Sequence, residues 1–251
     1  MDNIIRFIDE DGNLLPLEEV QKSVEAVYED FSREQCDCEC CEKYDNPLVE
    51  STSILSSLTN PDNSINIEDS TNTLAFLDRT LYLTDIIQPE SAISYADMIK
   101  FWNIVDDIDE IPVEKREPIK IYIDSPGGDL DATFSIIDAI ALSKTPVWTV
   151  TIGRGCSGAF FIGIAGHKRF GFPHSTYLFH EGCAENGGDA HKFIQGVKFY
   201  ETRLEMLKEH TLKHTKITEE KYKKHKKDDL WMTAEDAIKY GVIDEILTEI
   251  L

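Results

Sequence analysis

The 251 residues of the chain, 41% of them hydrophobic, suffice for one large domain with an appendage or for two small domains. The formal net charge of −22 is concentrated in residues 1–70, which hold 18 acidic against 4 basic side chains, so nucleic-acid binding is not expected. Without a run of about 18 apolar residues, a signal-peptide pattern or a dense cysteine framework, we expect a soluble cytoplasmic protein that crosses no membrane.

Residues 1–73 differ in composition from the rest of the chain, and we expect them to form an acidic N-terminal extension and linker. Apolar residues at spacings of three and four predict one amphipathic helix over residues 17–31. The acidic segment 36–41 holds four cysteines; we expect a thiol-rich loop without a metal, because zinc sites usually need a second pair of ligands, and zinc binding stays open as the alternative. Residues 45–72 are rich in Asn, Asp, Ser and Thr, which is typical of loops.

From residue 74 onward the pattern alternates between strands and helices, which predicts an α/β domain over residues 74–251. Strands are expected at residues 81–83, 119–123, 147–152 and 177–179. Helices are expected at residues 92–105, 132–142, 158–165, 189–214 and 234–240. Such an order favours parallel strands joined by crossover helices.

The segment Asp-Ser-Pro-Gly-Gly-Asp at residues 124–129 lies between a predicted strand and a predicted helix. Its glycine pair permits positive φ angles and a close approach of the backbone to a ligand. Backbone N–H groups at such a turn can bind an oxyanion. Taken alone, however, the segment is explained more simply as a plain strand-to-helix turn.

Two further segments contain a candidate nucleophile and a candidate base. Ser157 follows a predicted strand and opens a predicted helix, whose N-terminus favours developing negative charge. It is not part of the G-x-S-x-G motif of α/β-hydrolases, and a helix N-cap explains it equally well. His180 ends a predicted strand and suits a general base, because imidazole changes its charge near neutral pH; an ordinary surface histidine is the alternative.

In their order and context, these segments resemble the proteolytic subunit of the Clp protease family. Residues 125–128 match the family's Ser-Pro-Gly-Gly turn, residues 153–157 its Gly-x-x-x-Ser nucleophile segment, and His180 the catalytic histidine at a strand end. Residues 231–244 resemble the family's closing pattern, which begins with an aromatic residue.

The resemblance implies a serine endopeptidase that works through an acyl-enzyme. Ser157 would be the nucleophile and His180 the base. The catalytic aspartate of the family precedes the aromatic residue by two positions, which here is Asp229, with Asp228 as the fallback. The backbone N–H groups of Gly128 and Gly158 would form the oxyanion hole, and no metal or organic cofactor is implied.

The resemblance also implies a ClpP/crotonase-like fold of repeated β-β-α turns with a long protruding handle helix, here residues 189–214. Heptameric rings stacked in pairs would form a tetradecamer, into which an AAA+ unfoldase ATPase feeds unfolded polypeptides. The handle helix is expected to contact the second ring, with burial inside one subunit as the alternative. Residues 1–73 are equally compatible with a removable propeptide and with a permanent acidic tail.

The chain departs from the family pattern around the candidate nucleophile. Cys156 and Gly158 stand where the family usually has Ala and Met, and Glu181-Gly182 replaces the Gln-Pro that often follows the histidine. Glycine at position 158 adds backbone flexibility that would loosen the oxyanion hole. Two other functions stay open: a non-catalytic subunit of a Clp-type ring, and a crotonase-like acyl-CoA enzyme that uses two backbone N–H groups without a triad.

Overall fold

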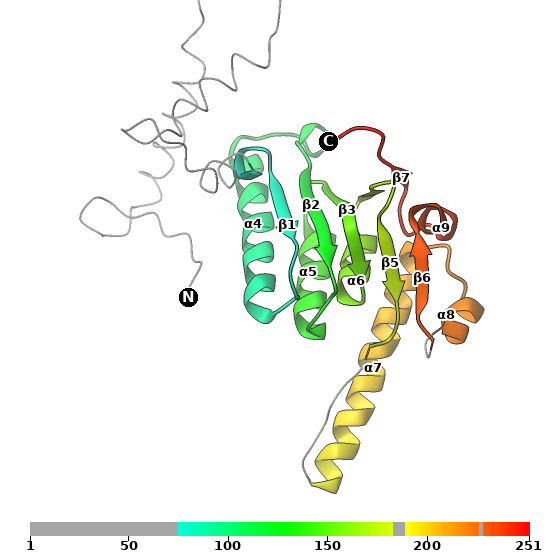
Figure 1. The fold of residues 1–251 in the computed structure, drawn as a ribbon. Helices are drawn as coiled ribbons and strands as arrows, with labels where there is room; N and C mark the ends of the chain where they lie inside the picture. The colour runs from blue at the N-terminus through cyan, green and yellow to red at the C-terminus, as the bar shows by residue number, and fades with distance from the viewer. Residues whose placement is uncertain (1–74, 183–188, 226–227) are drawn as a thin grey trace, which may run out of the picture. The chain divides into compact units, whose positions relative to one another are not determined.

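The computed structural model describes residues 75–182, 189–225 and 228–251. The helix and the cysteine cluster expected within residues 1–73 lie outside these ranges. Element labels follow Figure 1. Within the described ranges, no helix is both long and apolar enough to cross a bilayer.

The described residues form a seven-stranded sheet in which most neighbouring strands run parallel (Figure 1). The order β1-β2-β3-β4-β7 is parallel throughout. The last residues of β3 instead pair in parallel with β5, and β5 pairs antiparallel with β6. The strands are β1 (Thr80–Leu83), β2 (Ile119–Ser125), β3 (Val147–Cys156), β4 (Lys168–Gly171), β5 (Thr176–Phe179), β6 (Leu230–Thr233) and β7 (Glu245–Ile246).

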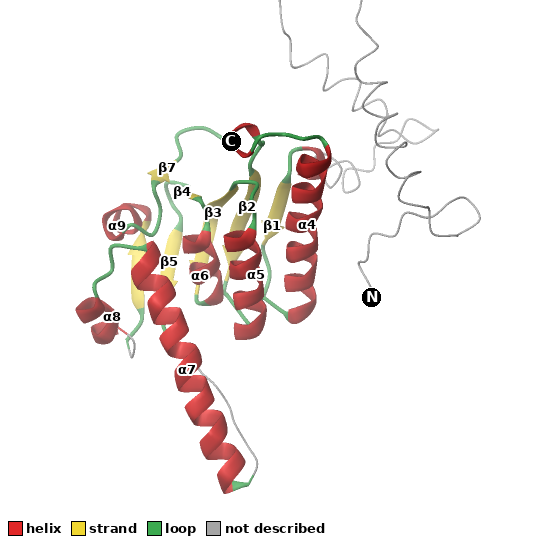
Figure 2. Cartoon of the chain, turned by 180° about the vertical axis from the view of Figure 1, so that it is seen from behind, coloured by secondary structure: helices red, strands yellow, loops and turns green. Residues whose placement is uncertain are grey.

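Helices α4, α5 and α6 cover one face of this sheet, as Figure 2 shows from behind. The alternation of side chains along β2 explains why. Ile121 and Ile123 point into the main core beneath these helices, whereas Tyr122 belongs to a smaller apolar cluster with Val150 and Phe170. The helices are α4 (Pro89–Ile108), α5 (Leu130–Leu142), α6 (Gly158–Ala165), α7 (Ala190–His214), α8 (Glu219–His225) and α9 (Ala234–Tyr240), with a 3₁₀ turn η2 (Val113–Lys115).

The expected α/β fold class is confirmed, and each strand and helix expected within residues 75–251 is present. Five of the elements named above were not expected, namely η2, β4, α8, β6 and β7. Three of these are strands of two to four residues, too short to show a clear alternation of polar and apolar side chains.

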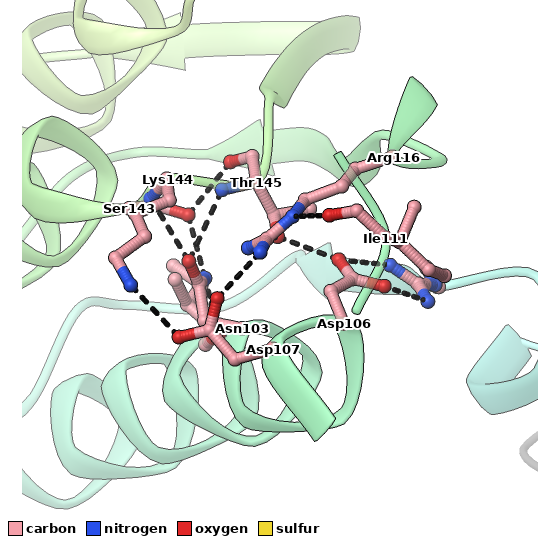
Figure 3. Close-up of polar contacts among 10 residues, drawn as sticks. Asn103, Asp106, Asp107, Ile111, Arg116, Ser143, Lys144 and Thr145 are labelled. Carbon is pink, nitrogen blue, oxygen red and sulfur yellow. Dashed lines mark hydrogen bonds and ion pairs between the residues drawn. The ribbon is translucent and has the colours of Figure 1, made fainter. Parts of the chain in front are cut away.

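A buried ion-pair network joins the C-terminal end of α4 to the segments that enter β1 and β3 (Figure 3). The guanidinium of Arg79 donates to both carboxylate oxygens of Asp106, at 2.6 and 2.8 Å. Thr145 donates to the same carboxylate at 2.6 Å and accepts from Arg116. This network lies at the N-terminal ends of the parallel strands β1, β2 and β3. Ser157 lies at the opposite, C-terminal end of β3.

Helix α7 has two halves with different surroundings. Figures 1 and 2 show its first half extending beyond the other helices, and the apolar side chains Ile194, Val197 and Phe199 are exposed there. The second half lies against α6, and Leu207 is buried. Burial inside one subunit therefore explains the apolar stripe of the second half only.

Candidate active site

Ser157 lies in the sharp turn between the end of β3 and the start of α6. Its backbone has φ 54° and ψ −121°, a conformation that non-glycine residues rarely adopt. Ser157 occupies the N-cap position of α6, as the alternative interpretation expected, but its side chain makes no capping hydrogen bond and is therefore not used as a cap. Strain of this kind costs about 1–3 kcal/mol and is concentrated at functional sites, which makes Ser157 a candidate nucleophile.

Parallel pairing of β3 with β5 brings His180 to the same edge of the sheet. Cys156 is the register partner of Leu178, and the Ser157 N–H extends the ladder by donating to the Leu178 carbonyl at 2.9 Å. His180 directly follows Phe179, the last residue of β5, and lies two residues after Leu178. Its side chain is 33% exposed. No hydrogen bond joins the Ser157 hydroxyl to the His180 ring within the described part of the chain.

Antiparallel pairing of β5 with β6 brings Asp229 to His180. Phe179 pairs with Leu230, so His180 and Asp229 occupy the next position beyond the end of the ladder. The Nδ1 atom of His180 lies 3.6 Å from Oδ1 of Asp229. The alternative, Asp228, is exposed and forms no ion pair with any described residue.

The glycine pair at residues 127 and 128 is held by a two-sided backbone contact with Ile87. The Ile87 N–H donates to the Gly127 carbonyl at 3.0 Å, and the Asp129 N–H donates to the Ile87 carbonyl at 2.9 Å. Gly127 has φ +93°, and a Cβ atom on Gly128 would lie 2.2 Å from the Ile87 carbonyl oxygen. Both positions therefore require glycine, one for its conformation and the other for its close packing.

The turn places the backbone of Gly128 next to that of Gly158. A Cβ atom built on Gly158 would lie 3.4 Å from the Gly128 nitrogen, and one built on Gly127 would lie 2.7 Å from the Gly158 nitrogen. Among the described residues, neither of these two N–H groups donates a hydrogen bond. Two adjacent donors without acceptors, beside a serine hydroxyl, are suited to a carbonyl oxygen that gains negative charge.

Ser125 and Asp124 build the base of this turn. The buried Ser125 hydroxyl donates to the Asp85 carbonyl at 2.6 Å and accepts from the Gly127 N–H at 3.1 Å. Asp124 accepts from the Arg154 backbone N–H at 3.0 Å and so joins the β2 end to β3. These contacts explain the polar residues of the Asp-Ser-Pro-Gly-Gly segment without giving them a chemical role.

Two buried side chains, Cys156 and Tyr222, have pKa values that are shifted by their surroundings. Burial raises the pKa of the Cys156 thiol, which keeps it protonated beside Ser157. Burial, followed by the charge of Glu181, raises the pKa of Tyr222. Within the ranges that the structure describes, no cluster of three His, Cys, Asp or Glu side chains is placed to hold a metal ion.

A sequence model of the Clp protease family matches residues 102–250, which is more than half of the chain. The chain belongs to the Clp protease family. The matched region begins inside α4 and includes Ser157, His180 and Asp229, whereas Ile87 and β1 lie outside it.

Individual members of the Clp protease family share about a third of the aligned residues with this chain. The ATP-dependent Clp protease proteolytic subunit 2 of Treponema denticola is 38% identical over 132 residues, which cover 52% of this chain and 66% of the relative. The subunit of the same name from Treponema pallidum is 32% identical over 133 residues, 52% of this chain and 67% of the relative. The proteolytic subunit from Deinococcus radiodurans is 31% identical over 136 residues, 53% of this chain and 67% of the relative.

Proposed function

We propose that this chain is a serine endopeptidase that hydrolyses peptide bonds through Ser157, His180 and Asp229. The observation that carries the proposal is the pairing of β3, β5 and β6, because the three side chains follow or precede adjacent ends of these strands. Membership of the Clp protease family and the names of the relatives, which describe proteolytic subunits, support it.

In this mechanism the Ser157 oxygen attacks the carbonyl carbon of the scissile peptide bond while His180 takes the hydroxyl proton. The tetrahedral intermediate collapses to an acyl-enzyme when His180 gives that proton to the leaving amine. Water, deprotonated by His180, then hydrolyses the ester and restores Ser157. Asp229 orients the imidazole and stabilises its charged form.

The developing oxyanion is bound by the N–H groups of Gly128 and Gly158. Loss of one such donor in another serine peptidase costs about 3–4 kcal/mol of transition-state stabilisation. The N-terminus of α6, which opens at Gly158, adds favourable partial charge at the same place. Neither a metal nor an organic cofactor takes part in these steps.

A fluorophosphonate probe tests the nucleophile. We expect one adduct on Ser157 in the parent protein, none in Ser157→Ala, and strongly slowed labelling in His180→Ala. His174→Ala is the matched control, because His174 is an exposed histidine of the same segment and labelling is expected to stay unchanged. A parent protein that gives no adduct on Ser157 contradicts the proposal.

Cleavage of a fluorogenic peptide by the purified chain distinguishes this function from a non-catalytic ring subunit, which would not cleave it. A crotonase-like acyl-CoA enzyme is the second candidate, because two adjacent free N–H groups would also polarise a thioester carbonyl. Tight acyl-CoA binding that persists in Ser157→Ala would favour this second candidate.

We further propose that the chain assembles into two stacked heptameric rings and receives unfolded polypeptides from an AAA+ unfoldase. Relatives named ATP-dependent support a separate ATPase, since this chain has no phosphate-loop motif. The exposed apolar residues of the first half of α7 support a contact between rings. A cytoplasmic location belongs to the same proposal and rests on the family resemblance.

A further inference from the structure

The glycine that follows the candidate nucleophile is not explained by its backbone conformation. Gly127, Gly182 and Gly241 are the described glycines with positive φ, and Gly158 is not among them. Position 158 would therefore accept an L-residue as far as its dihedral angles are concerned. Something other than backbone geometry excludes a side chain here.

The obstacle is the side chain of Thr133, from the first turn of α5. A Cβ atom on Gly158 would lie 2.5 Å from Thr133 Oγ1 and 3.1 Å from Ile87 Cδ1. Thr133 is fully buried, and its hydroxyl donates to the Asp129 carbonyl at 2.7 Å, so it cannot swing away without losing that bond in an apolar surrounding. The space beside Gly158 is thus already filled.

Thr133 also connects the two glycines that present the candidate oxyanion donors. Its N–H and its hydroxyl both donate to the carbonyl of Asp129, the residue directly after Gly128. Asp129 is fixed in turn by its N–H bond to Ile87 and by accepting from the Ala132 N–H as the cap of α5. One buried side chain therefore contacts the Gly158 backbone and anchors the turn that follows Gly128.

We propose that Thr133 is a positioning residue of the oxyanion hole, which compensates for the absence of a side chain at position 158. By filling the space beside Gly158 and holding Asp129, it fixes the separation of the Gly128 and Gly158 N–H groups. The flexibility expected from Gly158 is thereby removed. This inference rests on the proposed function, since the two donors matter only if a tetrahedral intermediate forms there.

The test is a double-mutant cycle on the assembled full-length protein. Thr133→Ala empties the space beside Gly158, and Gly158→Ala overfills it, so each substitution is expected to lower kcat. For Thr133→Ala we expect a loss of about tenfold, which is smaller than the 10²–10³-fold loss that follows removal of a whole oxyanion donor. The double variant places the methyl group added at position 158 in the space vacated by Thr133 and is expected to recover at least part of kcat. Such recovery is a coupling that independent sites do not show.

Three further measurements separate positioning from a merely structural role. KM for a short fluorogenic peptide is expected to change less than about twofold in Thr133→Ala, while binding of a peptide boronate, whose adduct on Ser157 mimics the tetrahedral intermediate, weakens in parallel with kcat. Thr133→Ser keeps the hydroxyl and is expected to restore most of kcat. Ser135→Ala is the matched control, because Ser135 makes the same hydroxyl bond to the residue four positions earlier in α5, Asp131, but is exposed.

Fluorophosphonate titration of Ser157 counts the competent sites, so that kcat is compared per folded subunit. If the parent protein neither labels on Ser157 nor cleaves peptide, the proposed function fails and this inference fails with it. If the parent is active and Thr133→Ala keeps kcat within twofold of it, the role of Thr133 alone is overturned. The role of Thr133 is also overturned if kcat of the double variant is no higher than kcat of the less active single variant.

Discussion

The Nδ1 atom of His180 lies 3.6 Å from a carboxylate oxygen of Asp229, although 48 residues separate them in the chain. The cause is the antiparallel ladder of β5 and β6, whose last pair joins Phe179 to Leu230. One more step along that ladder gives His180 opposite Asp229. The separation exceeds a hydrogen bond, as is common for catalytic groups before substrate binds.

Asp229→Asn is expected to lower kcat by about 10³–10⁴-fold, because the amide no longer stabilises a charged imidazole and favours the wrong tautomer. KM for a short peptide should change little. Asp228→Asn is the matched control, because Asp228 is an exposed residue next to Asp229 and the substitution removes the same charge. Steady-state hydrolysis of a fluorogenic peptide measures kcat and KM for both variants. Equal losses of kcat in the two would show that the local negative charge, and not the contact of Asp229 with His180, is what matters.

The sequence predicted the fold class and the main strands because hydrophobic alternation is a local property. Ile121 and Ile123 point into the core from a strand whose pattern is visible without the structure. The order of motifs also indicated Ser157 and His180, which the structure places at one edge through the register of β3 and β5. Their catalytic roles stay a prediction.

The contacts that shape the candidate site could not be predicted from the sequence, because they join segments that are distant along the chain. Ile87 holds the residues on either side of Gly128, namely Gly127 and Asp129, through two backbone bonds that almost any residue type at position 87 could make, so no side-chain signal marks it. Thr133 looks like an ordinary helix residue until its distance to Gly158 is known. Strand β6 was missed because the strand is short and Trp231 within it is exposed.

Cys156 is expected to resist alkylation even though it adjoins the candidate nucleophile. Burial raises the pKa of its thiol, so the reactive thiolate is scarce at neutral pH, and the sulfur is also inaccessible. Iodoacetamide at about pH 7.5 should modify Cys156 many times more slowly in the native protein than in urea, as peptide mapping by mass spectrometry would show. Equal rates under the two conditions would contradict this picture of the β3 end.

Asp106→Asn is expected to destabilise the fold by about 3–5 kcal/mol, because it leaves the Arg79 guanidinium without its carboxylate partner in a largely buried site. Glu245→Gln is the control. Its ion pair with Lys168 is about half exposed, so the expected cost is below about 1 kcal/mol. Urea unfolding at one fixed protein concentration compares the two, since the proposed assembly would also contribute to apparent stability.

The same carboxylate gives the pH dependence its sign. Burial raises the pKa of Asp106, but the hydrogen bonds from Arg79 and Thr145 and the charges of Arg79 and Arg116 outweigh it, so the folded-state pKa is lowered. The stabilisation from Asp106 is therefore complete above the unfolded-state value of about 3.9 and is lost as the pH falls through the folded-state pKa. Below about pH 4 the free energy of unfolding of the parent protein should fall more steeply with decreasing pH than that of Asp106→Asn. Parallel curves of this free energy against pH would show that another group dominates the acid sensitivity.

In the proposed double ring, the first half of α7 is expected to hold the two rings together through its exposed apolar residues. Ile194 and Phe199 are 52% and 63% exposed, and burying one such side chain contributes about 1.5–3 kcal/mol. A charge placed there must be desolvated, so Ile194→Glu should raise the dissociation constant of the double ring at least tenfold while single rings persist. Native mass spectrometry over a dilution series gives the ratio of the two species.

Gln195→Glu is the matched control for this substitution, because it adds the same charge to the neighbouring exposed position without removing apolar surface. We expect its double rings to dissociate close to the parent concentration. If Ile194→Glu and Gln195→Glu behave alike, repulsion between charges explains the effect and the apolar contact is not supported. If Ile194→Glu leaves the double ring intact at every concentration where the parent forms one, this end of α7 does not join the rings.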